Sequence, residues 1–145
     1  MSEAGAGAAS RTDGEAGGVA PARPEAATSE ALARRIAAIA LDRKALDVAI
    51  LDMRSLVAYT DFLVICTGNT ERQTKAIQDA IHLGLKQGAA GERLLPGRVE
   101  GLPEGRWILM DYLDCIVHIF TPAAREYYRL DTLWGEVPKL EVEEG

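Results

Sequence analysis

The most informative segment of the chain runs Trp107-Ile-Leu-Met-Asp-Tyr-Leu-Asp-Cys-Ile-Val-His-Ile-Phe120. It consists of two apolar runs, 107–112 and 115–120, separated only by Leu113 and Asp114. Runs of this length are typical of β-strands, and a two-residue connection is common between antiparallel neighbours. We therefore predict a β-hairpin over 107–120.

Alternation along the first strand of this hairpin gives it two different faces. Trp107, Leu109 and Asp111 point to one side, and the intervening residues, which end at Tyr112, point to the other. An aromatic side chain beside an aliphatic one and a charge is typical of a protein-interaction hot spot. In the alternative interpretation, Trp107 packs beneath the C-terminal segment around Trp134. The sequence pattern supports the two interpretations equally.

Two helices are predicted upstream of the hairpin. Apolar residues at helical spacing favour a helix over 29–44, with Ser29 as its N-cap. A second helix begins after Thr70, which forms a capping box with Gln73, and it stops at Gly88. Both helices are amphipathic, so each is expected to bury one face.

Three further strands are predicted around these helices. The apolar run 47–53 is bounded by charges and suits a strand that is buried on both faces. Residues 62–67 form a second apolar run. A Gly- and Pro-rich stretch then contains a short edge strand near 98–100.

A third helix follows the hairpin and completes the fold. Thr121 caps it, Pro122 occupies its first position, and it runs to about Leu130. The apolar segment 133–138 is expected to fold back on the body. The order α-β-β-α-β-β-β-α predicts an α/β sandwich of the α+β kind, with a mixed sheet and helices packed mainly on one face.

The chain divides into three parts of different composition. Residues 1–28 are dominated by Ala, Gly, Glu and Pro and contain no aromatic residue. Such a segment cannot bury enough surface to offset its chain entropy, so we predict a disordered tail. Residues 29–142 form the folded domain, and 143–145 are a short acidic end.

The net charge argues against a nucleic-acid partner. Among 145 residues, 16 are basic and 22 acidic, which gives a net charge of −6. Because affinity for phosphates comes largely from Lys and Arg, little direct contact with nucleic acid is expected. The protein part of a ribonucleoprotein stays open as a partner. No apolar run reaches the length of a membrane span, and no targeting leader is recognised, so a cytoplasmic protein is expected.

Cysteine and histidine residues do not form a recognisable site. Cys66 and Cys115 lie inside apolar runs, form no CxxC motif and are predicted to be buried thiols. His82 and His118 have no second ligand at metal-site spacing. His118, among apolar strand residues, is interpreted as structural. We therefore expect neither a metal nor a cofactor.

Signals for phosphate chemistry are equally weak. The turn Thr67-Gly-Asn-Thr70 opens a helix after a strand, but it lacks the GxGxxG and GxxxxGK[ST] patterns. Arg72 and Lys75 on that helix are interpreted as a solvated or partner-facing edge. Aspartates at strand ends include no Asp-x-Asp pair, and caps, turns and ion pairs account for them: Asp52, Asp61, Asp111 and Asp114. We therefore do not expect an enzyme.

Six sequence blocks resemble the ribosomal silencing factor family, also called the Iojap-like family. The resemblance covers about residues 30–138. In order, the blocks are Thr60-Asp-Phe-Leu-Val-Ile-Cys-Thr-Gly-Asn69, Arg72-Gln-Thr-Lys-Ala-Ile77, Trp107-Ile-Leu-Met-Asp-Tyr112, Val117-His-Ile-Phe120, Arg125-Glu-Tyr-Tyr128 and Leu133-Trp-Gly135.

The resemblance implies both a fold and a function. Members are similar in fold to nucleotidyltransferases but lack their Gly-Ser and paired-carboxylate motif, which this sequence lacks as well. They bind ribosomal protein fourteen of the large subunit and thereby block docking of the small subunit, which represses translation when nutrients are scarce. Organellar relatives assist large-subunit assembly or stability, and homodimers occur in the family.

The resemblance also implies a partner-facing surface on the sheet side around the Trp-containing strand. Here it corresponds to Trp107, Leu109, Asp111 and Tyr112, with Asp114, Arg72 and Lys75 as an extension. Two alternatives to a translation repressor stay open: a large-subunit assembly factor that uses the same surface, and a divergent nucleotidyltransferase.

Overall fold

The computed structural model describes residues 25–87 and 93–142 of the chain. These residues form four helices and six strands. In chain order they are α1 (Glu25–Asp42), β1 (Leu46–Asp52), β2 (Phe62–Thr67), α2 (Glu71–Lys86), β3 (Arg98–Glu100), β4 (Trp107–Asp111), β5 (Cys115–Phe120), α3 (Pro122–Tyr128), α4 (Leu130–Leu133) and β6 (Lys139–Leu140).

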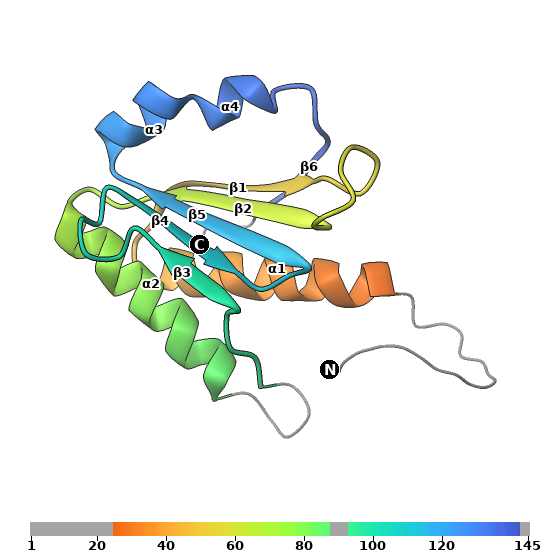
Figure 1. The fold of residues 1–145 in the computed structure, drawn as a ribbon, viewed down its shortest axis with the longest axis horizontal. Coiled ribbons are helices and arrows are strands. Elements are labelled where there is room, and N and C mark those ends of the chain that lie inside the picture. The colour runs from red at the N-terminus through yellow and green to blue at the C-terminus, as the bar shows by residue number, and fades with distance from the viewer. Residues whose placement is uncertain (1–24, 88–92, 143–145) are drawn as a thin grey trace.

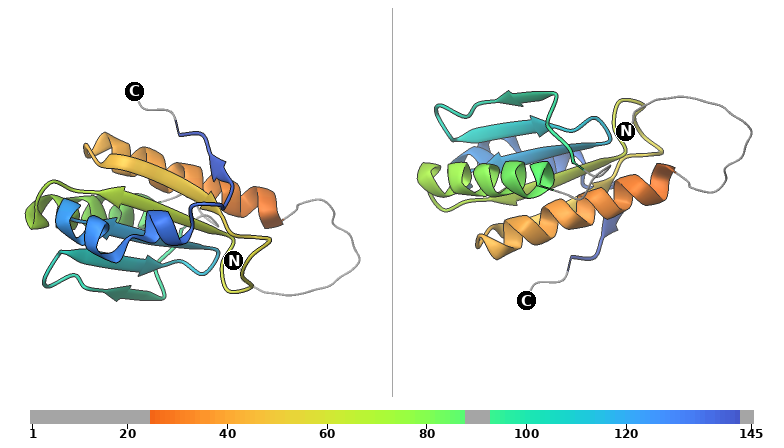
Figure 2. Two further views of the ribbon diagram at one scale, coloured as in Figure 1. Left: turned by 90° about the horizontal axis from the view of Figure 1, so that it is seen from above. Right: turned by 90° about the horizontal axis from the view of Figure 1, so that it is seen from below.

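All six strands belong to one mixed sheet in the order β3-β4-β5-β2-β1-β6 (Figure 1). β2 and β5 run parallel, and every other neighbouring pair is antiparallel. The long helices α1 and α2 cover one face, and the short helices α3 and α4 cross the other (Figures 1 and 2). We call these the α1/α2 face and the α3/α4 face. The predicted class, a mixed sheet with helices mainly on one face, is confirmed.

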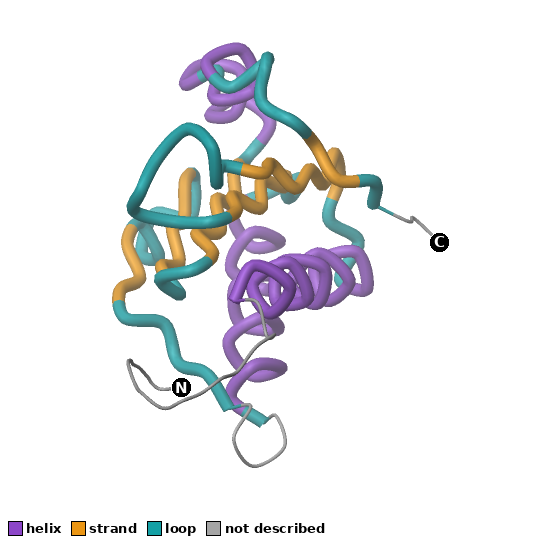
Figure 3. The backbone as a smooth tube through the Cα atoms, turned by 90° about the vertical axis from the view of Figure 1, so that its right-hand side faces the viewer, coloured by secondary structure: helices purple, strands orange, loops and turns teal. Residues whose placement is uncertain are grey.

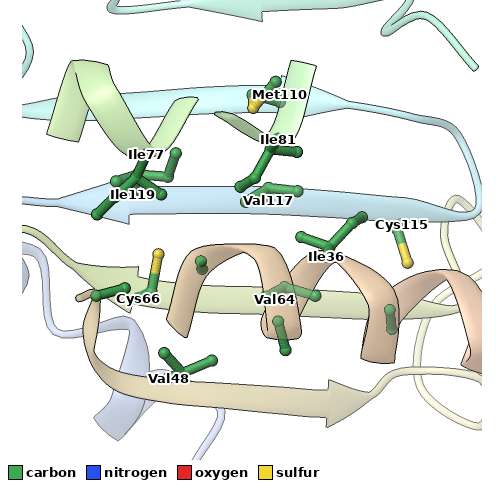
Figure 4. Packing of buried hydrophobic residues seen from close by; sticks show 14 of the residues in the cluster. Ile36, Val48, Val64, Cys66, Ile77, Ile81, Met110, Cys115, Val117 and Ile119 are labelled. Carbon is green, nitrogen blue, oxygen red and sulfur yellow. The ribbon is translucent and has the colours of Figure 1, made fainter. Parts of the chain in front are cut away.

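The larger hydrophobic core lies between the sheet and the two long helices. Figure 4 shows Ile77 and Ile81 of α2 above Val117 and Ile119 of β5, and Ile36 of α1 beside β2. The six residues of β2 and the six of β5 are all buried. A strand with covered side chains on both faces must be apolar throughout, which explains the continuous hydrophobic runs in the sequence.

A smaller core lies on the α3/α4 face. It is built from side chains of the inner strands and of the chain that follows β5: Leu51, Met53, Leu63, Ile65, Ile116, Phe120, Ala124 and Val137. Figure 3 shows the sheet edge-on between the short helices on one side and the long helices on the other. Since α3 and α4 are only seven and four residues long, they cover less of the sheet.

The first helix begins earlier than the sequence predicts. α1 starts at Glu25, so residues 25–28, which were predicted as tail, are helical. Ser29 lies in the second turn of α1 and is therefore not its N-cap. Its Oγ donates a hydrogen bond of 2.7 Å to the Asp61 carboxylate. The rest of the predicted tail, 1–24, and the acidic end, 143–145, lie outside the described residues.

The start of α2 is confirmed, but its capping box is only half formed. Thr70 accepts a hydrogen bond of 3.1 Å from the Gln73 backbone N–H, as predicted. The Gln73 side chain does not return to Thr70; it donates instead to the Arg43 carbonyl. That contact ties the α1–β1 connection to the start of α2. The helix ends at Lys86, and the predicted stop at Gly88 lies outside the described residues.

The C-terminal region differs most from the prediction. The helix after β5 ends at Tyr128 because Arg129 adopts a left-handed conformation (φ 55°), and α4 begins at the next residue. The chain then folds back, as predicted, and buries Val137. It adds an unpredicted strand, β6, whose Leu140 pairs with Ile50 at the edge of the sheet. No helix in the described part of the chain is long and apolar enough to cross a membrane.

Candidate functional site

The predicted hairpin is confirmed, and its register defines the site. Trp107 pairs with Phe120, Leu109 with His118 and Asp111 with Ile116. Directly opposed residues of antiparallel strands project to the same face, which here is the α3/α4 face. The sequence-predicted grouping of Trp107, Leu109 and Asp111 on one face is therefore correct.

The turn of the hairpin holds Leu113 in a strained conformation. Its φ is 78°, and the Asp114 N–H donates to the Tyr112 carbonyl at 2.9 Å across it. This is a γ-turn centred on a residue that rarely adopts positive φ. The Asp111 carboxylate accepts the Leu113 N–H at 2.8 Å and so fixes the turn. The turn presents the Leu113 side chain, 74% exposed, to solvent.

Trp107 is half buried in an aromatic cluster. Its ring centroid lies 4.4 Å from that of Tyr128 and 5.1 Å from that of Phe120. Its Nε1–H donates a hydrogen bond of 3.0 Å to Nδ1 of His118. The ring of Trp107 therefore contacts α3 and β5. The alternative interpretation placed Trp107 beneath the segment around Trp134, whereas the structure places it beside Tyr128 of α3. Part of the indole stays accessible.

His118 is a neutral imidazole with a defined tautomer. Burial lowers its pKa to about 4, so it carries no charge near neutral pH. Since Nδ1 accepts the Trp107 N–H, the proton of the neutral ring is assigned to Nε2. The sequence interpretation of His118 as a structural residue accounts for Nδ1, which accepts the Trp107 hydrogen bond, and not for Nε2.

A hollow of about 540 Å³ lies beside Trp107 and His118, between the hairpin and α4. We call it the hairpin groove. Its floor is the α3/α4 face of β2, β4 and β5, and α4 with the residue after it forms one wall. The lining side chains are Tyr59, Leu63, Arg98, Leu109, Asp111, Leu113, Ile116, His118, Leu130, Leu133 and Trp134.

The rim of the hairpin groove is unusually apolar for a protein surface. Leu113, Leu133 and Tyr59 are 74%, 65% and 59% exposed. They come from three separate segments that the fold brings together around one hollow. Exposed apolar side chains gathered beside a groove, with a few polar ones among them, mark interaction sites. The arrangement can hold an apolar protein segment.

One polar pair lies at the end of the groove near the hairpin turn. An Nη atom of Arg98 is 3.8 Å from an Asp111 carboxylate oxygen, and both side chains are partly exposed. Arg98 was predicted only as part of an edge strand, and β3 places it against β4. Among the lining residues that the structure describes, this pair supplies the two charged side chains.

Tyr112 is a correction to the predicted site. It lies on the α1/α2 face, is 6% exposed and belongs to the larger core. Burial raises the pKa of its hydroxyl to about 12. Strand alternation places it opposite to Trp107, so it cannot share a partner with the groove residues.

The remaining predicted residues do not join the groove. Asp114 is exposed in the hairpin turn, and its carbonyl accepts the Asp61 and Phe62 N–H groups. Arg72 and Lys75 are exposed on α2, the helix that covers the other face of the sheet. The structure does not bring them together with Trp107 and Leu109.

Sequence reasoning missed most of the groove wall. Leu130, Leu133 and Tyr59 line it because of how α4 and the β1–β2 loop are placed, and no local pattern encodes that. One signal was available: Leu113, a large apolar residue in a two-residue turn, where Gly, Asn or Asp is usual.

A second hollow, of about 460 Å³, lies at the carboxyl ends of β2 and β5. Ligands often bind at this position in α/β proteins. Here Arg125 donates to the Asp47 carbonyl (2.7 Å) and to the Thr67 hydroxyl (2.9 Å). Arg129 and Glu126 also line it, so its two cations face two acidic residues and favour no anion.

The two cysteines are buried, as the sequence predicts. Cys66 and Cys115 are buried free thiols, and burial raises the pKa of Cys66 to about 12 and that of Cys115 further. Over 25–87 and 93–142, no three His, Cys, Asp or Glu residues lie close enough to hold a metal ion.

Comparison with known proteins identifies relatives over nearly the whole folded region. Residues 26–145 match the profile of a family described as "Ribosomal silencing factor during starvation". The chain is 39% identical over 102 residues to the ribosomal silencing factor of Halalkalibacterium halodurans, which covers 70% of this chain and 84% of the relative. It is 37% identical over 112 residues to that of Bacillus subtilis, covering 77% and 92%.

Plant and structural relatives agree with this match. The chloroplastic Iojap protein of Arabidopsis thaliana is 30% identical over 117 residues, which are 80% of this chain and 47% of that protein. A crystal structure from Chromobacterium violaceum superposes with a TM-score of 0.65 at 31% identity, covering 84% of this chain and 97% of the other. One from Bacillus halodurans gives 0.60 at 36%, covering 74% and 95%.

Proposed function

The chain belongs to the ribosomal silencing factor family, and on this premise we propose that it is a translation repressor. In this proposal it binds the large ribosomal subunit in the cytoplasm, through ribosomal protein fourteen, and blocks association with the small subunit. It acts by occupying a surface and needs neither catalysis nor a cofactor. The observation that carries the proposal is the hairpin groove with its exposed apolar rim.

The groove has the features that a protein partner requires. A standard interface buries about 800 Å² on each side, and its affinity comes from a few apolar and aromatic anchors near the centre. Leu113 of the hairpin turn and Leu133 of α4 both line the hollow and offer such anchors. Trp107 lies beside it and is braced by Tyr128.

The charge of the chain supports a protein contact rather than an RNA contact. A net charge of −6 disfavours binding to rRNA phosphates. The same charge complements a basic ribosomal protein and steers its approach. The Arg98–Asp111 pair at one end of the groove gives the contact a polar point that fixes orientation.

The proposal is tested by co-sedimentation of the full chain with separated ribosomal subunits. The wild type should pellet with large subunits and not with small ones. Leu133→Asp places a charge on the rim, so it should weaken binding at least tenfold. Leu95→Asp is the matched control, because Leu95 is 63% exposed against 65% for Leu133 and does not line the groove.

Absence of wild-type binding to large subunits would contradict the proposal, as would equal loss in both variants. Circular dichroism of each variant verifies that it is folded.

On the family resemblance we also propose that the free protein self-associates, which analytical ultracentrifugation would measure.

The assembly-factor alternative uses the same surface and differs in timing. If it is the main role, a deletion strain should accumulate immature large subunits during growth. If repression is the main role, the strain should assemble normal subunits and fail to reduce translation under starvation. Sucrose gradients and labelled amino-acid incorporation separate these outcomes.

A further inference from the structure

The floor of the hairpin groove contains one polar group that the fold leaves unused. His118 is 8% exposed, and in the described part of the chain the one hydrogen bond of its side chain joins Nδ1 to the Trp107 indole. Leu63, Leu109 and Ile116 surround it on the floor. The Nε2–H is therefore a donor set among apolar side chains.

This donor is accessible from the groove. Among the described residues, one side-chain nitrogen or oxygen atom is both fully buried and without a hydrogen-bond partner, and it is the Tyr112 hydroxyl. Nε2 of His118 has no partner either but is not fully buried. His118 also lines the hollow. An atom without a protein partner that is not sealed off must face the open space, so Nε2 points to a position that a ligand atom can occupy.

We propose that His118 anchors and orients the segment docked in the groove: its Nε2–H donates a hydrogen bond to a main-chain carbonyl of the docked ribosomal protein. The inference rests on the proposed function and names the chemistry of its contact. Trp107 is a positioning residue in this account, because its Nε1–H fixes which nitrogen of His118 carries the proton.

The acceptor is uncharged for a physical reason. A carboxylate moved onto this floor would lose its hydration and gain one neutral donor, which does not compensate for the loss. Burial keeps His118 uncharged, so it cannot supply the missing positive charge. A main-chain carbonyl needs one hydrogen-bond donor, and the His118 Nε2–H supplies it. The partner segment therefore places a main-chain carbonyl between apolar side chains that fill the groove.

Two substitutions separate the roles of the two ring nitrogens. His118→Gln places an amide N–H near the position of Nε2 and gives up the acceptor for Trp107. His118→Asn places an amide oxygen near Nδ1, keeps the acceptor for Trp107, and gives up the donor. If His118 served only to accept the Trp107 hydrogen bond, Asn would preserve its role better than Gln. If it donates a hydrogen bond to the partner, Gln would preserve its role better than Asn.

The experiment titrates the full-length protein with purified large ribosomal subunits and measures Kd for the wild type and both variants. We expect His118→Asn to raise Kd roughly tenfold, because a buried carbonyl of the partner loses its donor. His118→Gln should stay within about threefold of the wild type. Equal Kd values for all three proteins, or tighter binding by Asn than by Gln, would overturn the proposal.

Failure of this inference is distinguishable from failure of the proposed function. If Leu133→Asp weakens binding and His118→Asn does not, the groove docks the subunit without using the donor. If the wild type does not bind, the proposed function itself fails. Should a variant not fold, ¹⁵N chemical shifts of the wild-type imidazole give the tautomer directly. A protonated Nδ1 would contradict the proposal, and a protonated Nε2 supports it.

Discussion

The two faces of the sheet are made from the same strands and are covered very differently. On the α1/α2 face, Ile36, Ile77 and Ile81 have no exposed surface. On the α3/α4 face, two short helices leave the hairpin end open, and Leu113 and Leu133 stay mostly exposed. Because side chains alternate along a strand, one face can supply stability while the other supplies recognition.

The largest expected effect is on the α1/α2 face. Ile81→Ala removes a fully buried side chain from between α2 and the sheet. We expect the free energy of unfolding to fall by about 3 kcal/mol, from lost burial and the cavity left behind. Chemical denaturation measures it.

The matching change on the α3/α4 face is Leu133→Ala. Leu133 is 65% exposed, so its loss should cost less than about 0.5 kcal/mol. If Leu133→Ala destabilised the fold as much as Ile81→Ala does, the claim that stability comes mainly from the α1/α2 face would be wrong.

An effect smaller than that of Ile81→Ala concerns the response of the α3/α4 face to acid. Burial lowers the pKa of His118 to about 4, against about 6.5 for an unfolded chain. Between these values the unfolded chain binds a proton that the folded chain does not, so stability is lost as the pH falls. From pH 7 to pH 5 the free energy of unfolding should fall by about 2 kcal/mol, measured in urea.

The control for this effect is His118→Gln, which has no titrating group and should flatten the profile between pH 7 and pH 5. Tyr112, buried on the other face with its pKa raised to about 12, does not titrate in this range. The same slope in His118→Gln would assign the acid response to other groups and contradict the buried neutral imidazole.

The last expected effect is small and has opposite signs for stability and binding. Leu113 is held at φ 78°, which glycine adopts without strain. Leu113→Gly should therefore raise the free energy of unfolding by about 0.5 kcal/mol. It should also weaken binding to large subunits, because the most exposed apolar side chain of the groove is removed. Improved stability with unchanged affinity would show that Leu113 is not an anchor.

Patterns that depend on neighbours in the chain could be predicted from the sequence. The hairpin, both faces of β4, the Thr70 cap and the Thr121-Pro122 helix start each follow from local spacing. Period-two alternation placed Trp107, Leu109 and Asp111 on one face correctly. It also placed Tyr112 on the other, and including Tyr112 in the site contradicted that alternation.

Features that depend on distant contacts could not be predicted. β6 is two residues long, and only its pairing with β1 makes it a strand. The break between α3 and α4 rests on the left-handed conformation of Arg129, a residue type that gives no such signal. The groove exists because α4 returns over the hairpin, so its wall could not be assigned before the fold was known.

The central claim is that the hairpin groove docks on the large subunit and prevents subunit joining. The direct measurement mixes separated subunits at a magnesium concentration that favours joining and follows whole ribosomes by light scattering. The account predicts that the wild type lowers the joined fraction in proportion to its occupancy of large subunits, that Leu95→Asp does the same, and that Leu133→Asp does not. Normal joining with large subunits saturated by the wild-type protein would contradict it.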